Sequence, residues 1–278
     1  MATFIIARLT FFEASRRKIL WAALALGLTF LALFGLGFHE IQKDITRNSP
    51  SSLVNLSEIY NFILMAGLYV VNFLTVMMSV LTAVDTLSGE IASGTIQTLL
   101  SKPVRRWEIL LGKWLGYIGM LTLYLLLMAG GVMALVYLIS GYSPPHAWRG
   151  LGLMWLNSLL LLNATLMGGS SLSTLANGVL VFGLYGVAFI GGWVEQFGSL
   201  LENQAAVNIG IFSSLLMPAE ALWRRAAFEM QSPLVAAMGF SPFTSGTSVP
   251  SPLMIVYAVL FAGISLAAAI YLFGKRDM

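Results

Sequence analysis

SGEIASGTIQTLLSKPVRRWEILLGK, residues 88–113, is a polar stretch that lies between two long uncharged runs. Neither the run before it, residues 59–84, nor the run after it, residues 114–139, contains Asp, Glu, Lys or Arg. Each is long enough to cross a bilayer as a helix, which takes about 20 mostly apolar residues. A polar segment between two membrane spans is a place where a soluble partner can bind. The pattern therefore favours a membrane subunit that works with a second chain.

The composition is that of an integral membrane protein. Of the 278 residues, 58% are hydrophobic and 10% are charged, whereas soluble globular proteins have about 25% charged residues. The absence of cysteine excludes disulfides, thiol nucleophiles and cysteine metal sites. The net charge of +3 is interpreted as a topology signal, and we expect no binding to nucleic acid.

Uncharged runs predict six membrane spans, because a charged residue at the centre of a span costs about 2.5–3.5 kcal/mol. The run over residues 150–194 is too long for one helix, and a small polar cluster at Ser170–Thr174 divides it in two. The expected fold class is an all-α polytopic membrane protein, with residues 1–278 forming one transmembrane domain. The predicted spans are residues 19–38, 59–84, 114–139, 150–170, 175–194 and 252–274.

The basic residues predict the orientation of these spans. Six spans place both termini on the same side of the membrane. With the N-terminus inside, ten Lys and Arg residues lie on cytoplasmic segments, and Lys and Arg gather on that side. We therefore expect cytoplasmic termini. The five basic residues left outside are Lys43, Arg47, Arg149, Arg224 and Arg225.

Two segments outside the spans have helical patterns of their own. Residues 2–18 mix aromatic, aliphatic and basic side chains, which predicts an amphipathic helix at the cytoplasmic interface; the alternative is an irregular basic tail. Residues 195–251 form an extracytoplasmic segment. Within it, Ala205–Met217 is apolar but too short to span, so we expect a re-entrant or interfacial helix.

An amphipathic helix is expected to follow at Ala219–Met230. Pro218 fits the first turn of such a helix. Trp223 and Phe228 are its expected anchors at the membrane interface, where aromatic side chains are enriched.

Residues 85–113 predict a helix, a tight turn and a second helix on the cytoplasmic side. Ile91, Ile96 and Leu99 provide an apolar stripe. Pro103 marks the break, because the residue before a proline avoids the helical conformation and proline fits a helix start. The stripe could bury against a partner, and the charges could pair across the interface. The alternative is a solvated loop.

The same segment resembles the signature of ABC-2 type transporter permeases, the membrane subunits of bacterial ATP-binding cassette exporters. The family pattern is (S)GE…GT…LLS-P…R…LGK, and the ending FGKRD, residues 273–277, is also similar to that of many such permeases. The matching positions are Ser88, Gly89, Glu90, Gly94, Thr95, Leu99, Leu100, Ser101, Pro103, Arg106, Leu111, Gly112 and Lys113.

The resemblance implies a transporter powered from outside this chain. A nucleotide-binding ATPase subunit would dock on residues 85–113, and a second permease copy would complete a homodimeric export pathway in a bacterial plasma (inner) membrane. Membrane lipids and an extracytoplasmic accessory protein are the other partners considered. The residues implied in docking and coupling are Gly89, Glu90, Gly94, Thr95, Pro103, Arg105, Arg106, Glu108 and Lys113.

The chain has no nucleotide-binding motif of its own. The sequence G-x-x-x-x-G-K-[ST] does not occur, because Gly112-Lys113 is followed by Trp114. We therefore expect no enzymatic activity and no cofactor on this chain, with ATP and Mg bound by the partner ATPase.

Side chains within the spans give few further signals. No charged residue lies in the middle of a predicted span, and the dispersed methionines and the two histidines predict no metal site. Polar side chains of the second span could line a central pathway; the alternative is hydrogen bonding between helices, worth about 0.6 kcal/mol each. These candidates are Tyr69, Asn72, Thr75 and Ser79.

Other functions are less well supported. An intramembrane enzyme would need a paired nucleophile and base within a span. A secondary transporter would show inverted repeats or charges inside the membrane. A non-transporting assembly or signalling scaffold with the same fold is not separated from a permease by the sequence. No residue identifies the substrate.

Overall fold

The computed structural model describes residues 2–48, 53–94, 104–232, 240–241, 244–245 and 248–276. Apart from the two-residue strands β1 (Phe240–Ser241) and β2 (Thr244–Ser245), which pair antiparallel, its regular elements are helices. Six of them are long and apolar enough to cross a membrane, which confirms the predicted fold class. They are α2 (Lys18–Asn48), α3 (Leu53–Ala83), α6 (Arg106–Ser140), α7 (Ala147–Gly169), α8 (Thr174–Leu200) and α12 (Pro252–Lys275).

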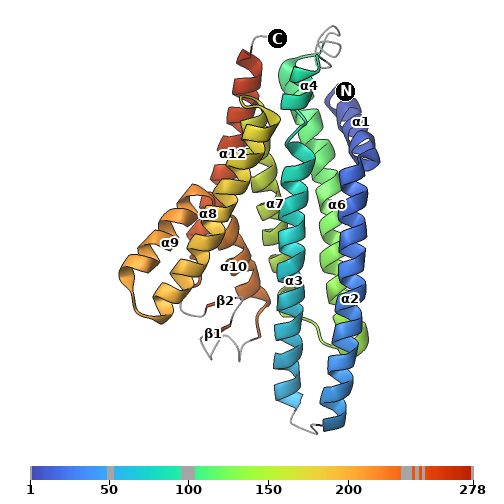
Figure 1. Cartoon of the computed structure of the whole chain (residues 1–278), viewed down its shortest axis with the longest axis vertical. Coiled ribbons are helices and arrows are strands. Elements are labelled where there is room, and N and C mark those ends of the chain that lie inside the picture. Colours follow the sequence, from blue (N-terminus) through green and yellow to red (C-terminus); the bar gives the residue numbers. More distant parts are fainter. Residues whose placement is uncertain are drawn as a thin grey trace.

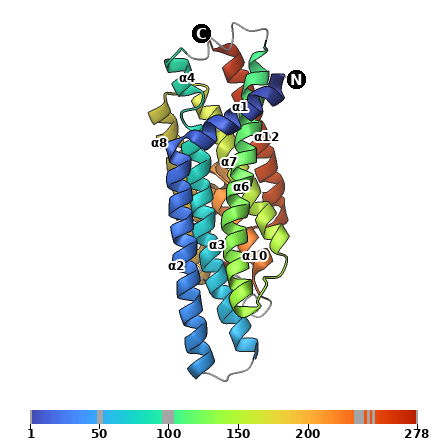
Figure 2. The ribbon, with the colours of Figure 1, turned by 90° about the vertical axis from the view of Figure 1, so that its right-hand side faces the viewer.

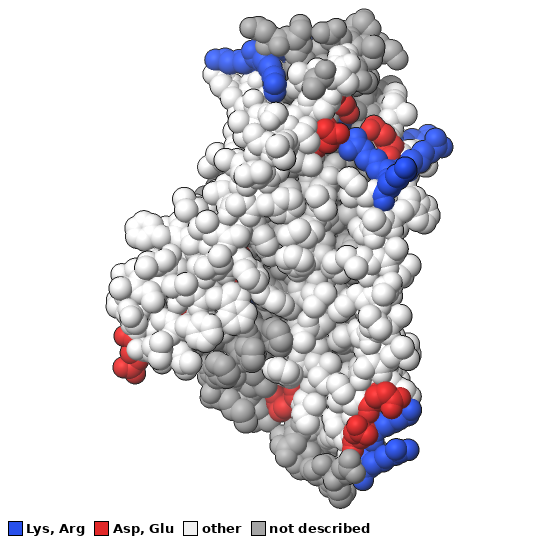
Figure 3. All heavy atoms as spheres, viewed as in Figure 1, with Lys and Arg blue, Asp and Glu red and all other residues white. Residues whose placement is uncertain are grey.

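The long helices lie side by side in an elongated bundle (Figure 1). Both the first view and the view turned by 90° (Figure 2) place the N-terminus, the C-terminus and the short helix α4 (Ser88–Ala92) at the same end. On the face drawn in Figure 3, charged side chains lie mainly toward the two ends, with a wide uncharged band between them. This distribution suits a body whose middle is surrounded by lipid.

Several helices extend beyond the predicted spans. Uncharged runs mark only the part that must lie in hydrocarbon, whereas backbone hydrogen bonding continues into the flanking polar residues. Helix α6 begins at Arg106, where the Glu108 carboxylate accepts a hydrogen bond from the backbone N–H of Arg105 at 2.9 Å. It ends at Gly141, whose φ of 70° is the left-handed conformation that glycine adopts easily.

Helix α1 (Ala2–Arg16) packs along the first half of α6. Its buried side includes Ala7 and Thr10, while Phe4 and Leu9 are exposed on the other side. A Cβ atom on Gly116 would lie 2.7 Å from the carbonyl oxygen of Ala7, so the glycine allows the two backbones to approach closely. The predicted helix is therefore present; its location at the membrane interface stays a prediction.

Helices α9 (Gln204–Leu216) and α10 (Ala219–Met230) form a pair bent by 105°. Helix α9 lies against α8, and α10 is enclosed by α3, α7, α8 and α12. This enclosure overturns one expectation: Trp223 is fully buried, and its ring lies tilted against the ring of Tyr69, with centroids 5.3 Å apart. Trp223 is therefore no interface anchor, while Phe228 is only half-buried.

Replacing Gly210 by alanine should separate α9 from α8. A Cβ atom there would lie 2.6 Å from the carbonyl oxygen of Gly191 and 2.9 Å from the Cα of Glu195, and neither backbone atom can move away easily. We expect a loss of about 1–3 kcal/mol, as for other overpacked sites. The measurement is thermal stability of the purified protein, with Gly183→Ala as control, because a Cβ on Gly183 meets nothing within 4 Å. Equal stability of the two variants would contradict the packing.

Candidate functional site

The candidate site is the junction where α3 continues into α4. The chain leaves α3 at Ala83, turns, and forms the short helix α4. This helix ends before Gly94, which has a φ of 70°. Gly89 lies directly against Asp85, and a Cβ atom on Gly89 would come 2.6 Å from the carboxyl carbon. Two of the residues expected in coupling, Thr95 and Pro103, lie outside the described residues.

A buried ion pair ties α4 to α6. The Lys113 ammonium donates to the Glu90 carboxylate, and the two side chains are 4% and 15% exposed. The second carboxylate oxygen of Glu90 is also buried and has no hydrogen-bond partner. We expected both residues to face a partner, but the structure places Lys113 inside the chain. It can influence a docked partner only through Glu90.

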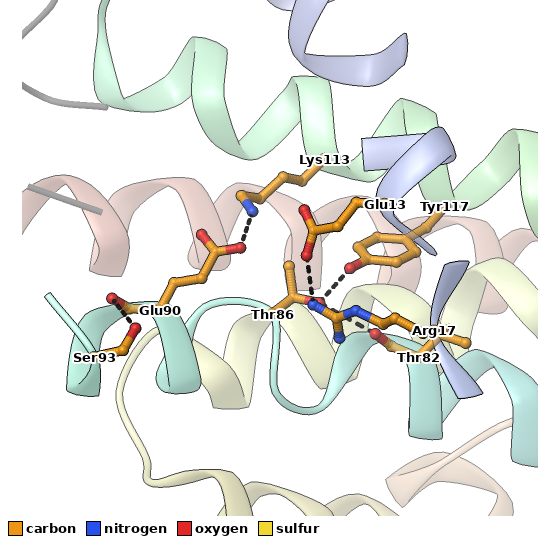
Figure 4. A network of polar contacts seen from close by, with 8 residues as sticks. All are labelled: Glu13, Arg17, Thr82, Thr86, Glu90, Ser93, Lys113 and Tyr117. Atoms are coloured by element: carbon orange, nitrogen blue, oxygen red, sulfur yellow. Dashed lines mark hydrogen bonds and ion pairs between the residues drawn. The ribbon is translucent and has the colours of Figure 1, made fainter. Parts of the chain in front are cut away.

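A second contact lies beside this ion pair, where the α1–α2 junction meets α3 and α6 (Figure 4). The hydroxyls of Thr86 and Tyr117 are 2.5 Å apart. Arg17, at the junction, donates to Glu13 at 2.9 Å, and Figure 4 shows its guanidinium next to the Thr86–Tyr117 pair. Burial opposes the charge of Arg17, but Tyr117, Glu13 and Asp85 together raise its pKa above the usual value, so Arg17 stays cationic.

Helix α8 also reaches this junction. The Thr174 hydroxyl donates to Asp85 at 2.9 Å and lies 2.9 Å from the hydroxyl of Ser88. Thr174 is the first residue of α8, and Ser88 is the first residue of α4. The short helix is therefore held by polar contacts to two different spans, α6 and α8.

The charged residues at the start of α6 have three different positions. Arg106 donates to the carbonyl oxygens of Gly274 and Arg276, at 3.0 and 2.8 Å. These bonds supply donors to carbonyl groups at the C-terminal end of α12, where the helix itself provides none. Glu108 caps its own helix, as described above. Arg105 is exposed. Of these three expected coupling residues, only Arg105 has an exposed side chain whose charge a partner could contact.

Comparison with known proteins identifies the family. A family model described as "ABC-2 family transporter protein" matches residues 4–278. The chain belongs to this family. A similar relative is the "Probable ABC transporter permease protein NosY" of Stutzerimonas stutzeri, which is 28% identical over 282 aligned residues covering 93% of this chain and 91% of the relative. The chain is thus a permease subunit of an ABC transporter and a multi-pass membrane protein.

Of the four side chains considered for pathway lining, Asn72, Thr75 and Ser79 are buried in this permease and Tyr69 is partly buried. Asn72 accepts a hydrogen bond from Asn157 of α7 at 3.1 Å. Thr75 and Ser79 donate to carbonyl oxygens one turn earlier in α3, each at 2.8 Å. Both hydroxyls are therefore satisfied within their own helix. Tyr69 differs from the other three, because its ring lies against Trp223 of the bent helix pair.

Sequence reasoning missed a buried charged cluster of the permease in the bent pair. Arg224 of α10 donates to Glu195 of α8 at 2.7 Å and to the hydroxyl of Ser248 at 3.1 Å. Ser248 in turn donates to Glu195. The arginine and glutamate side chains are 4% and 10% exposed. The only sequence signal was a pair of opposite charges in neighbouring apolar segments, and it does not reveal which charges meet.

Groups of three or more His, Asp or Glu that could hold a metal ion do not occur in the parts of the permease that the structure describes. The candidate site therefore consists of ion pairs and hydrogen bonds between helices. Such an arrangement can hold helices together and transmit movement between them.

Proposed function

We propose that this permease forms a dimeric exporter with two separate nucleotide-binding ATPase subunits, and that each ATPase docks on the α4 junction. The observation that supports this most is the attachment of α4 to α6 and α8. A five-residue helix at one end of the bundle, next to both chain ends, is bound to two spans by the Glu90–Lys113 and Asp85–Thr174 contacts. ATP and Mg would be bound by the ATPase, and no cofactor by this chain.

These contacts suggest how a docked subunit could move the spans. A force on α4 would act on α6 through Lys113, which is buried and paired with Glu90. The same force would act on α8 through Thr174. Because the interior of a protein is close-packed, small shifts at one end of a helix are carried along its length. Movement of α6 and α8 would then open or close a pathway between two permease copies.

The orientation with cytoplasmic termini also belongs to this proposal. The α4 end holds both termini, so an ATPase that docks there must be on the same side as the termini. Arg224 was counted as an outside charge, yet it is paired within the protein. A paired arginine is a weaker topology signal, so Arg224 counts less against cytoplasmic termini than an unpaired outside charge would. An accessory protein on the opposite side stays a prediction.

The test is co-expression with a candidate ATPase, chosen as a neighbouring reading frame that carries the motif G-x-x-x-x-G-K-[ST]. We expect the two chains to co-purify from detergent, and the permease to stimulate ATP hydrolysis. Failure of both would reject the docking proposal. Transport in reconstituted vesicles, with ATP supplied on one side only, then tests the direction of transport.

Replacing Arg105 by glutamate should weaken docking. Arg105 is exposed at the start of α6, and reversing a rim charge changes association more than folding. We expect roughly tenfold weaker binding, equivalent to about 1.4 kcal/mol, measured by titrating labelled ATPase onto permease in lipid nanodiscs. Arg47→Glu is the matched control, since Arg47 is exposed near the C-terminal end of α2, away from α4. Similar binding of both variants would show that Arg105 is outside the docking surface.

A further inference from the structure

Glu220 is a buried carboxylate without a cation of its own. It is 5% exposed and forms no ion pair with any residue that the structure describes. It occupies the first turn of α10, directly after the bend at residues 217–218. Its side chain packs against α8 so closely that a Cβ atom on Gly192 would come 2.5 Å from its Cγ.

Glu220 lies deep in the membrane part of the permease. The other end of α10, at Met230, packs against Gly150 near the start of α7. Glu220 is therefore roughly 15 Å further along, at about 1.5 Å per residue, and the hydrocarbon core of a bilayer is about 30 Å thick. Figure 1 accordingly shows α10 starting near the middle of the bundle. An ionisable group at such depth is expected to have a function.

Near Glu220, the described residues include more carboxylates than cations. Arg224, one turn later in α10, is the cation nearest in the same helix, but its two terminal nitrogens donate to Glu195 and Ser248, and its Nε has no hydrogen-bond partner. Glu220 in turn acts electrostatically on Tyr69 of α3 and Tyr185 of α8, whose hydroxyl groups bring no positive charge. One cation thus serves two carboxylates.

We propose that Glu220 is a proton-binding site inside this permease, and that gain and loss of this proton set how tightly α10 packs on α8. Burying an ionised carboxylate without a partner is costly, whereas its protonated form is neutral and can also donate a hydrogen bond. Glu195 already accepts hydrogen bonds from both Arg224 and Ser248, whereas Glu220 forms no ion pair with any described residue. The proton therefore resides on Glu220.

The exchange is a simple acid–base step. The carboxylate takes up one proton from water and becomes a carboxylic acid, and no other bond changes. In the protonated form α10 remains packed on Gly192. In the ionised form Glu220 requires water or a cation, so α10 should move away from α8 as the pH rises. Because α10 contacts both α9 and α12, its movement could control one end of a transport pathway.

The test is infrared spectroscopy of the full-length permease in lipid nanodiscs between pH 5 and pH 9. We expect the carbonyl band of a buried, protonated carboxylic acid at neutral pH, and its loss as the pH rises. Glu220→Gln should lack the band, and the control Glu202→Gln, at the exposed tip between α8 and α9, should keep it. A band that persists in Glu220→Gln, or no band in the unmodified protein, would overturn the proposal.

A second measurement follows the movement. The chain has no cysteine, so Ala227→Cys introduces a single label site on the buried surface of α10. Its maleimide labelling, normalised to the denatured protein at each pH, should rise several-fold toward high pH and stay flat when Glu220→Gln is added. A rise that is equal with and without Glu220 would contradict the coupling. If Glu220→Gln fails to fold, Glu220→Asp should shift both pH midpoints instead, and unchanged midpoints would count against the site.

Discussion

Replacing Lys113 by methionine is expected to abolish the coupling between ATP hydrolysis and transport. The substitution removes the cation but leaves the Glu90 carboxylate largely buried and unpaired. Breaking a buried ion pair from one side costs about 3–5 kcal/mol, and we expect the low end of this range because Glu90 is 15% exposed. Helix α4 should then detach from α6, and the permease should no longer stimulate the ATPase.

The measurement pairs ATPase stimulation with thermal unfolding of the permease. The double variant Glu90→Gln with Lys113→Met should recover most of the lost stability, because removing both charges of a buried pair is often nearly neutral. It should not recover full stimulation if the ion pair transmits movement. Lys43→Met is the control, since Lys43 and Glu40 form an exposed pair worth about 0–1 kcal/mol. Full stimulation by Lys113→Met would refute the proposed role of the ion pair.

Replacing Arg224 by methionine is expected to be the most destabilising single change in the bent helix pair. It leaves Glu195 and Glu220 buried without any cation between them. We expect a loss of about 3–5 kcal/mol, visible as a lower unfolding temperature and as loss of protein from the membrane fraction.

The control for Arg224 is Arg149→Met. Arg149 is half-exposed and lies 3.5 Å from Glu229, so its removal should cost less than about 1 kcal/mol. Adding Glu195→Gln to Arg224→Met should restore stability, since it removes one of the unpaired carboxylates. If Arg224→Met is as stable as Arg149→Met, the buried cluster does not hold α8 and α10 together.

The spans and the family were accessible from the sequence because each rests on local information. Hydrocarbon excludes charge, so uncharged runs mark the spans directly. The motif of residues 88–113 is continuous in the chain. The pairing of Glu90 with Lys113 was not accessible, although both residues were singled out, because pairing depends on how α4 and α6 are placed next to each other.

Helix α10 shows a second reason why sequence reasoning was incomplete. Its alternation of polar and apolar residues predicted an amphipathic helix at the membrane interface, with its polar side in contact with water. In the structure its charged residues Glu220 and Arg224 point into the protein, and Trp223 is buried as well. A polar side can face either water or another set of charges, and periodicity alone does not tell these apart.

The small size of α4 has a consequence for regulation. A helix of five residues is too short to be stable alone, so its shape depends on the positions of α6 and α8. If an ATPase binds this shape, its affinity depends on the same positions. A ligand that shifts α6 or α8 would then change the affinity of the permease for the ATPase. By thermodynamic linkage, ATPase binding would change the affinity of the permease for that ligand by the same factor. A transported molecule that shifts α6 or α8 would thus change the affinity of the ATPase for the permease without contacting the ATPase.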